Sequence, residues 1–192
     1  MSADLGDVLL LVVAALERLG VSYAIGGSFA SSAHGVPRST NDIDIVAELN
    51  PKHALPLAKI LQPEFYADEV AIARAIRERR SFNVIHVDSS FKVDVFVAKG
   101  EAFDRAQLAG RRLVAIAENL DHQVYVASPE DTILAKLVWY KKGREVSDQQ
   151  WRDIQGVLRV QAGKLDIDYI KKWAAELGVS ELLDRALDAA FS

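Results

Sequence analysis

The sequence predicts an α/β (α+β) fold in which a mixed sheet is flanked by helices and followed by a C-terminal helical part. Segments with apolar residues at every second position alternate with segments of helical spacing up to Ala127, and from Ser128 onward only helical spacing remains. At 192 residues, 50% of them hydrophobic, the chain can bury one core with a small helical appendage. We therefore expect a core over residues 1–127 and a helical subdomain over 128–192 packed on it.

Local signals define the elements of the first part. Residues 4–19 have helical spacing and stop at Gly20, while Asn50 and Pro51 predict the cap and first position of a helix over 51–61. Polar residues 88–90 separate two alternating segments, so 81–87 and 91–97 are predicted to form a hairpin. The other expected elements are strands at 22–25, 41–48, 111–117 and 123–127, and helices at 28–34, 68–79 and 101–109.

Capping residues define the helices of the second part. Ser128 followed by Pro129 predicts a helix start, because serine caps the first N–H groups and proline suits the first turn. Ser147 and Gln150 form a capping box at the start of the next helix, which Gly163 closes. The last two helices are expected at 166–177 and 180–190.

Composition excludes several classes of function. The chain has no cysteine, which rules out disulfides, thiolate metal sites and thiol redox chemistry. A net charge of −4 argues against wholesale wrapping of nucleic acid but allows a local basic patch. The apolar stretch 8–16 is too short to span a bilayer and follows acidic residues, so neither a membrane partner nor a signal peptide is expected and the location is predicted to be cytoplasmic.

Two aspartates one residue apart are the most informative motif. Asp42 and Asp44 alternate with Ile43 and Ile45, so strand geometry sends both carboxylates to one face and both isoleucines to the other. Two such like charges repel unless a cation or hydrogen bonds lie between them, and hard cations such as magnesium take oxygen ligands. The pattern predicts a metal site, although a solvated strand also carries such pairs.

A glycine pair precedes the aspartates. Gly26, Gly27 and Ser28 follow a short apolar run and lead into small residues with helical character. Such a turn lets backbone approach a ligand closely, and the N–H groups of a helix start bind phosphate. The alternative is an ordinary tight turn.

A third aspartate lies on a later predicted strand. Val93, Val95 and Val97 share one face there, which leaves Asp94 on the other face with Lys92. A third carboxylate is thus available to the metal site, unless Asp94 is a surface residue that pairs with Lys92.

These motifs resemble the nucleotidyltransferase superfamily of DNA polymerase beta-like fold. Its pattern is a strand, Gly-Gly or Gly-Ser, a helix, Asp-hydrophobic-Asp on the next strand and a third Asp on a later strand. The segment from Arg38 to Asp44 also resembles the Arg-x-Thr-x-Asp-x-Asp form of the minimal and abortive-infection toxin-type members. The resemblance covers residues 20 to 97 and makes 1–127 the nucleotidyltransferase catalytic core.

The resemblance implies transfer of a nucleoside monophosphate from a nucleoside triphosphate (NTP) such as ATP to an acceptor hydroxyl. Asp42, Asp44 and Asp94 would be catalytic and would hold Mg2+ or Mn2+, with two ions about 3.5–4 Å apart. Toxin-type members carry a lysine in a helix after Pro-Glu-Asp and an aspartate on the next helix, so Lys136 is implied as catalytic. The implied nucleotide-binding residues are Gly26, Gly27, Ser28, Arg38, Thr40, Lys136 and Asp153.

Several alternatives stay open. Lys136 could extend its stem along a packed surface, and Asp153 could be a capping or salt-bridge residue. The acceptor could be RNA, a protein or a small molecule, and a cognate partner protein is expected if the chain is one half of a toxin–antitoxin pair. The other functions considered are a non-catalytic, antitoxin-like module that binds a nucleotide or a partner, and a nucleotide-sugar glycosyltransferase.

Overall fold

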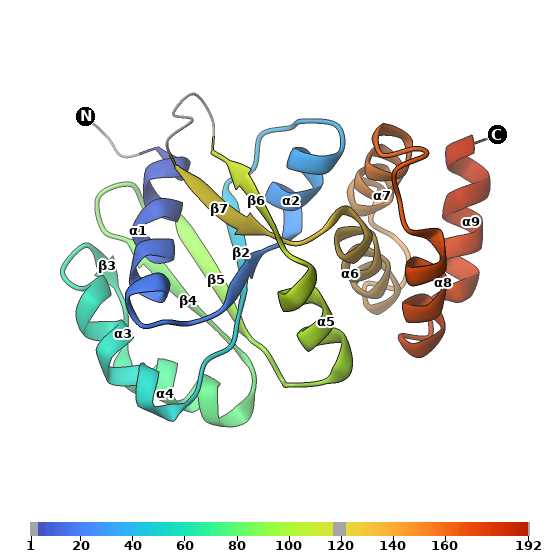
Figure 1. Cartoon of the computed structure of the whole chain (residues 1–192). Coiled ribbons are helices and arrows are strands. Elements are labelled where there is room, and N and C mark those ends of the chain that lie inside the picture. The colour runs from blue at the N-terminus through green and yellow to red at the C-terminus, as the bar shows by residue number, and fades with distance from the viewer. Residues whose placement is uncertain (1–3, 117–121, 192) are drawn as a thin grey trace. The chain divides into compact units, whose positions relative to one another are not determined.

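The computed structural model describes residues 4–116 and 122–191. Within these residues it contains a seven-stranded mixed sheet and nine α-helices, which confirms the predicted α/β fold (Figure 1). The chain divides into two compact units. The sheet unit consists of Met1–Ile25 and Thr40–Val126, and the helical unit consists of Gly26–Ser39 and Ala127–Ser192.

The sheet unit is built on strands in the order β3-β4-β5-β2-β1-β7-β6. The pairs β2/β5 and β1/β7 are parallel and the other four are antiparallel, including the predicted hairpin of β4 and β5. These few parallel pairs do not form the repeated βα units that the glycosyltransferase alternative expects. The strands are β1 (Tyr23–Ile25), β2 (Asp42–Ala47), β3 (Phe65–Tyr66), β4 (Ser81–His86), β5 (Lys92–Val97), β6 (Arg112–Ala115) and β7 (Gln123–Val126).

Alternating side chains give the sheet a buried apolar face. Ile43 and Ile45 of β2 lie opposite Val93 and Val95 of β5 in the parallel register, and all four are at most 1% exposed. Their burial in one continuous layer anchors the two central strands, and each such side chain contributes about 1.5–3 kcal/mol relative to an exposed one. The polar side chains between them are therefore held on the opposite face.

Three helices of the sheet unit, α1, α3 and α4, group on its apolar side, whereas Leu108 of α5 packs with Ala24 and Val46 on the other face. Helix α1 presents Val8, Leu9, Val12 and Leu16 to the core, and it begins at a capping box of Asp4 and Asp7. Contacts of α1 with α3 and of α3 with α4 form one layer (Figure 1). The helices are α1 (Leu5–Arg18), α3 (Ala54–Leu61), α4 (Glu69–Glu78) and α5 (Ala102–Gly110).

The helical unit packs α2 against α6 and α7, although α2 comes from the first part of the chain. Gly35, which caps α2, makes this approach possible, because a Cβ there would lie 2.8 Å from the Ser31 carbonyl oxygen and 2.9 Å from the Val157 nitrogen. The helices are α2 (Gly27–His34), α6 (Pro129–Lys142), α7 (Asp148–Val160), α8 (Ile167–Glu176) and α9 (Ser180–Phe191).

The structure differs from the predicted elements at a few places. The helix expected over 51–61 starts as a 3-10 turn, Pro51–His53, before α3 begins at Ala54. The two-residue strand β3 was not predicted because it is too short to show alternation. Ala117, the expected end of a strand, lies outside the described residues. Among the described helices, none combines the length and apolar character needed to cross a membrane.

Candidate active site

The three aspartates share one face of the sheet unit. Asp44 lies directly opposite Asp94 in the parallel β2/β5 register, and Asp42 precedes Asp44 by two residues on the same side of β2. Directly opposite residues on neighbouring strands have Cβ atoms about 4.5–5.5 Å apart. Asp42 is exposed, whereas Asp44 and Asp94 are half-buried. We call Asp42, Asp44 and Asp94, together with Lys92, the acidic face.

Lys92 is the counter-ion of the acidic face. Its Nζ lies 2.7 Å from Asp94 Oδ2, and its position on β5 is opposite Asp42. The hydrogen bond to Asp94 and the negative charges of all three aspartates raise the pKa of Lys92 above its ordinary value, so the ammonium stays charged. A cation is thus already present where strand geometry gathers three carboxylates.

The chemistry of the acidic face suits a divalent metal ion. Its donors are carboxylate oxygens, which Mg2+ and Mn2+ prefer. In residues 4–116 and 122–191, however, no three His, Cys, Asp or Glu side chains are grouped closely enough to hold a metal. The Lys92 ammonium stands in for a cation at Asp94, so a metal that used all three carboxylates would have to displace it.

Thr40 supports the start of β2. Its hydroxyl donates to the Asp42 carbonyl oxygen at 3.1 Å and accepts the Asp42 N–H at 3.4 Å. These bonds are local to the turn before the strand. The contact that the structure gives Thr40 is therefore to the backbone of a proposed metal ligand.

The glycine pair forms the start of α2. Gly26 is the N-cap, and Gly27 has a φ of 55°, a left-handed conformation that glycine adopts without steric cost. A Cβ on Gly26 would meet no atom within 4 Å, so the space beside this turn is open. Because the first N–H groups of a helix lack intrahelical acceptors, the turn suits an anion such as phosphate.

A buried ion cluster lies in the helical unit. Arg38 donates two hydrogen bonds to Asp153, from Nε to Oδ1 at 3.1 Å and from Nη2 to Oδ2 at 3.1 Å. The same Nη2 also donates to the Ser28 hydroxyl. Lys136 Nζ lies 2.8 Å from Asp153 Oδ2, and Gln149 donates to Oδ1 at 2.9 Å. Two cations thus surround one carboxylate beside the first turn of α2.

The ion cluster settles how Lys136 and Asp153 are held. Only 9% of the Lys136 side chain and 7% of the Asp153 side chain are exposed, so Lys136 ends at an ion pair and not in solvent. Burial of Asp153 works to raise its pKa, but the hydrogen bonds from Arg38 and Lys136 outweigh it and hold the pKa below its ordinary value. The carboxylate remains ionised and the cluster keeps one uncompensated positive charge.

The structure thus brings the predicted site residues together in two sets. Asp42, Asp44 and Asp94 with Thr40 belong to the sheet unit, whereas the glycine turn and the ion cluster belong to the helical unit. Two further polar residues were not predicted. Asn83 lies opposite Asp94 in the β4/β5 register, and Gln149 contacts Asp153. Alternation places Asn83 on the outer face of its strand, but the partner opposite it depends on the register.

The fold is similar to that of solved structures of an antibiotic-resistance factor. The solution structure of the antibiotic-resistance factor ANT(2'')-Ia matches with a TM-score of 0.57 and 15% identity, covering 96% of this chain and 97% of the other. The crystal structure of ANT(2'')-Ia in complex with adenylyl-2''-tobramycin matches with a TM-score of 0.56 and 15% identity, over 89% and 95%.

At this level of identity the likeness shows a shared fold. A third structure, the lincomycin-bound lincosamide antibiotic adenylyltransferase LnuA, has a TM-score of 0.48 and 13% identity over 79% of this chain and 95% of the other. No protein-family model matches the sequence, and no curated protein sequence matches it. The two ANT(2'')-Ia structures thus confirm the predicted fold, and the roles of the site residues stay predictions.

Proposed function

We propose that the protein is a metal-dependent nucleotidyltransferase, which moves a nucleoside monophosphate from an NTP to an acceptor hydroxyl and releases pyrophosphate. The observation that carries the proposal is the register that sets Asp94 beside Asp44, on the same face as Asp42, within a nucleotidyltransferase fold. Three carboxylates at neighbouring positions repel one another unless a cation lies between them, and a bound metal ion would relieve this repulsion.

In this proposal the acidic face holds the metal. Asp42, Asp44 and Asp94 would be its ligands, and Lys92 would release Asp94 when the metal binds. A bound divalent cation such as Mg2+ or Mn2+ would activate the acceptor oxygen and stabilise charge on the triphosphate. Asp94 is the candidate to accept the proton of the acceptor hydroxyl, since a carboxylate near a polarised hydroxyl is a plausible base.

The helical unit would hold the triphosphate. The N–H groups at Gly27 and Ser28 suit phosphate oxygens, and the positive charge of Arg38 and Lys136 suits the charge that develops on the phosphates. Asp153 would orient both cations instead of contacting the nucleotide, because both of its oxygens already accept hydrogen bonds from side chains. This makes Asp153 a positioning residue.

The acceptor is proposed as RNA or a protein hydroxyl, with a small molecule as the third class. The toxin-type motifs support the first two, and a cognate partner protein acting in the cytoplasm, where NTPs are abundant, would fit them. The third is supported by the solved complex of ANT(2'')-Ia with adenylyl-2''-tobramycin. These classes differ in how the labelled product responds to nuclease and protease.

The test is to incubate purified protein with each α-labelled NTP, Mg2+ or Mn2+ and a cell extract. We expect label to pass from one NTP into an acceptor, in a reaction that chelator and the Asp44→Asn variant both abolish. Loss of the label to nuclease or to protease identifies RNA or protein, and resistance to both indicates a small molecule. No metal-dependent labelling with any NTP, or equal labelling by Asp44→Asn, would contradict the proposal.

The non-catalytic alternative also has an observation in its favour. Lys92 forms an ion pair with Asp94. Among the residues that the structure describes, no three His, Cys, Asp or Glu side chains lie close enough together to hold a metal. A module that only binds a nucleotide or a partner would leave this ion pair intact. Titration with Mn2+ distinguishes the two, because the alternative predicts no binding that depends on Asp44 and Asp94.

A further inference from the structure

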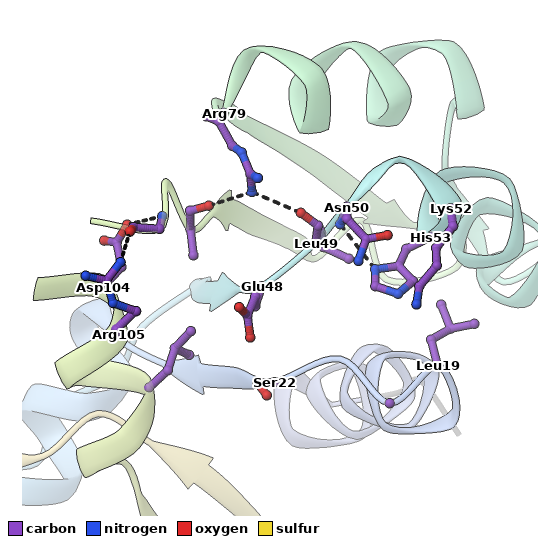
Figure 2. A pocket seen from close by; sticks show the side chains of 14 residues that line it. Leu19, Ser22, Glu48, Leu49, Asn50, Lys52, His53, Arg79, Asp104 and Arg105 are labelled. Atoms are coloured by element: carbon purple, nitrogen blue, oxygen red, sulfur yellow. Dashed lines mark hydrogen bonds between the residues drawn. The ribbon is translucent and has the colours of Figure 1, made fainter. Parts of the chain in front are cut away.

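A polar pocket opens in the sheet unit (Figure 2), and none of the acidic-face residues lines it. It has a volume of about 300 Å³ and lies where β2 and β5 end. Glu48 follows the last residue of β2 and Asp42 is its first, so the two are roughly 20 Å apart along the strand. Its polar lining includes Glu48, Lys52, His53, Arg79, Asp104 and Arg105.

Arg79 is fixed at the wall of this pocket. It caps α4 in the left-handed conformation with a φ of 52°, which is uncommon for a residue with a side chain. Its Nη1 donates to the carbonyl oxygens of Leu49 at 3.1 Å and Ala98 at 2.9 Å, so the guanidinium spans the ends of β2 and β5 (Figure 2). Within the described residues, Nε and Nη2 have no hydrogen-bond partner. Two donors of a rigid fork thus remain available.

The charged side chains of the pocket form no ion pairs with one another in the part of the chain that the structure describes. Glu48 projects into the middle of the lining residues (Figure 2), and it forms no ion pair with Lys52, Arg79, Arg105 or any other described residue. Asp104 differs, because its Oδ2 accepts three backbone N–H groups, from residues 99, 100 and 101, at 2.7 to 3.4 Å. Asp104 therefore closes a turn and Arg105 Nη1 donates to the Gly100 carbonyl oxygen in the same turn, whereas Glu48 has no such partner among the described residues.

His53 adds a neutral donor. The ring is 7% exposed, and its Nδ1 accepts the Asn50 backbone N–H at 3.2 Å, which leaves the proton on Nε2. Burial, and then the nearby Lys52 charge, lower the pKa of His53, so the ring is neutral near pH 7. The pocket thus combines one free carboxylate, three cations and an uncharged N–H donor.

We propose that this pocket binds a small amino-acid-type zwitterion, with its ammonium at Glu48 and a carboxylate at the free donors of Arg79. The fork of an arginine matches a carboxylate in geometry. Because three cations line the pocket against two carboxylates, an acidic amino acid, which carries one net negative charge, is preferred over a neutral one. A phosphate dianion fits less well, since Glu48 repels it without compensation. The site is independent of the proposed nucleotidyl transfer.

The test measures the unfolding midpoint of the purified protein without nucleotide or metal, in the presence of glutamate, glutarate or inorganic phosphate. Glutarate is glutamate without its ammonium. At ten times its Kd, we expect glutamate to raise the midpoint by roughly 3–6 °C, and glutarate and phosphate to raise it much less. Isothermal titration provides the Kd of each.

Two variants sharpen the result. Glu48→Gln should weaken glutamate binding about tenfold and remove the preference over glutarate, because the ammonium loses its counter-ion. Glu64→Gln, an exposed acid outside the pocket, should bind like the parent. The proposal is overturned if no amino acid binds, if glutamate and glutarate bind equally to the parent, or if phosphate binds more tightly than glutamate and Glu48→Gln strengthens it.

Discussion

A Lys92→Met substitution keeps most of the side-chain stem and removes the ammonium that lies 2.7 Å from Asp94 Oδ2. If Lys92 is the counter-ion that a metal must displace, the variant should be less stable without metal and should bind metal more tightly. The two effects have the same origin, since the three carboxylates lose their neutralising charge in the metal-free state. A purely structural lysine would lower stability without improving metal binding.

The solvent exposure of Lys92 and Asp94 sets the expected size of both changes, in stability and in metal affinity. The Lys92 side chain is 42% exposed and that of Asp94 is 22% exposed, so solvent screens the pair and its contribution is at most about 1 kcal/mol. The free energy of unfolding of metal-free protein should fall by about that amount. The Kd for Mn2+ should fall about 5-fold, which is the same free energy expressed as an equilibrium constant.

The assay is isothermal titration with Mn2+ in the absence of nucleotide, paired with urea unfolding in chelator and in saturating Mn2+. Lys59→Met on α3 is the matched control, because it removes the same charge from an exposed position of the sheet unit. Lys59→Met should change neither the Kd for Mn2+ nor the free energy of unfolding. In Lys92→Met the stability deficit should disappear when Mn2+ is saturating.

An unchanged Kd in Lys92→Met would show that the metal does not compete with this lysine. A higher Kd in Lys92→Met would show instead that Lys92 orders the carboxylates for the metal. Either result would refute the counter-ion argument, whereas the three-carboxylate site itself would be refuted only if Asp44→Asn and Asp94→Asn bound Mn2+ like the parent.

Four other substitutions probe the rest of the fold and site. Asp44→Asn should lower metal-dependent nucleotide transfer by roughly 100-fold or more with an unchanged unfolding midpoint, since it removes a ligand charge and empties no core; transfer at the parent rate would disprove the metal chemistry. Asp153→Asn should cost about 3 kcal/mol by leaving Arg38 and Lys136 without their anion. Because the pKa of Asp153 is lowered in the fold, its stabilisation is complete above its ordinary value of 3.8 and is lost as pH falls through the lower folded pKa, so acid unfolding of the parent should show a pH dependence that the variant lacks. Gly35→Ala should cost about 1–3 kcal/mol, because its Cβ would lie 2.8 Å from a carbonyl oxygen, whereas Gly26→Ala, with no atom within 4 Å, should cost less than about 1 kcal/mol, since alanine is only a poorer N-cap.

Local signals predicted most of the sheet unit. Alternation fixed which side chains of β2 and β5 face the core, so the common face of Asp42 and Asp44 followed from the sequence. Capping residues located the helix starts, as at Ser128 and Ser147, whose hydroxyls accept backbone N–H groups. What these signals share is that each depends on residues only a few positions apart.

The features that were not predicted depend on distant residues. The sequence predicted that Asp94 joins Asp42 and Asp44, but its position directly opposite Asp44 and Asn83 requires the strand register, which no single strand contains. The bond network of Asp153 joins Arg38 to α7 across more than a hundred positions, and the exposed or buried state of Lys136 follows from it. The pocket at Glu48 likewise forms from loops after separate strands.

The discontinuous helical unit has a consequence for how the chain is made. Helix α2 leaves the ribosome early, but its packing partners α6 and α7 follow only after almost the whole sheet unit has been synthesised. Until then Ala30 and the Gly35 cap have no surface to pack on, so the helical unit cannot complete folding before the last third of the chain emerges. A fragment that begins at Ala127 lacks α2, and circular permutation that joins the two ends offers a cleaner way to change the order of synthesis than truncation.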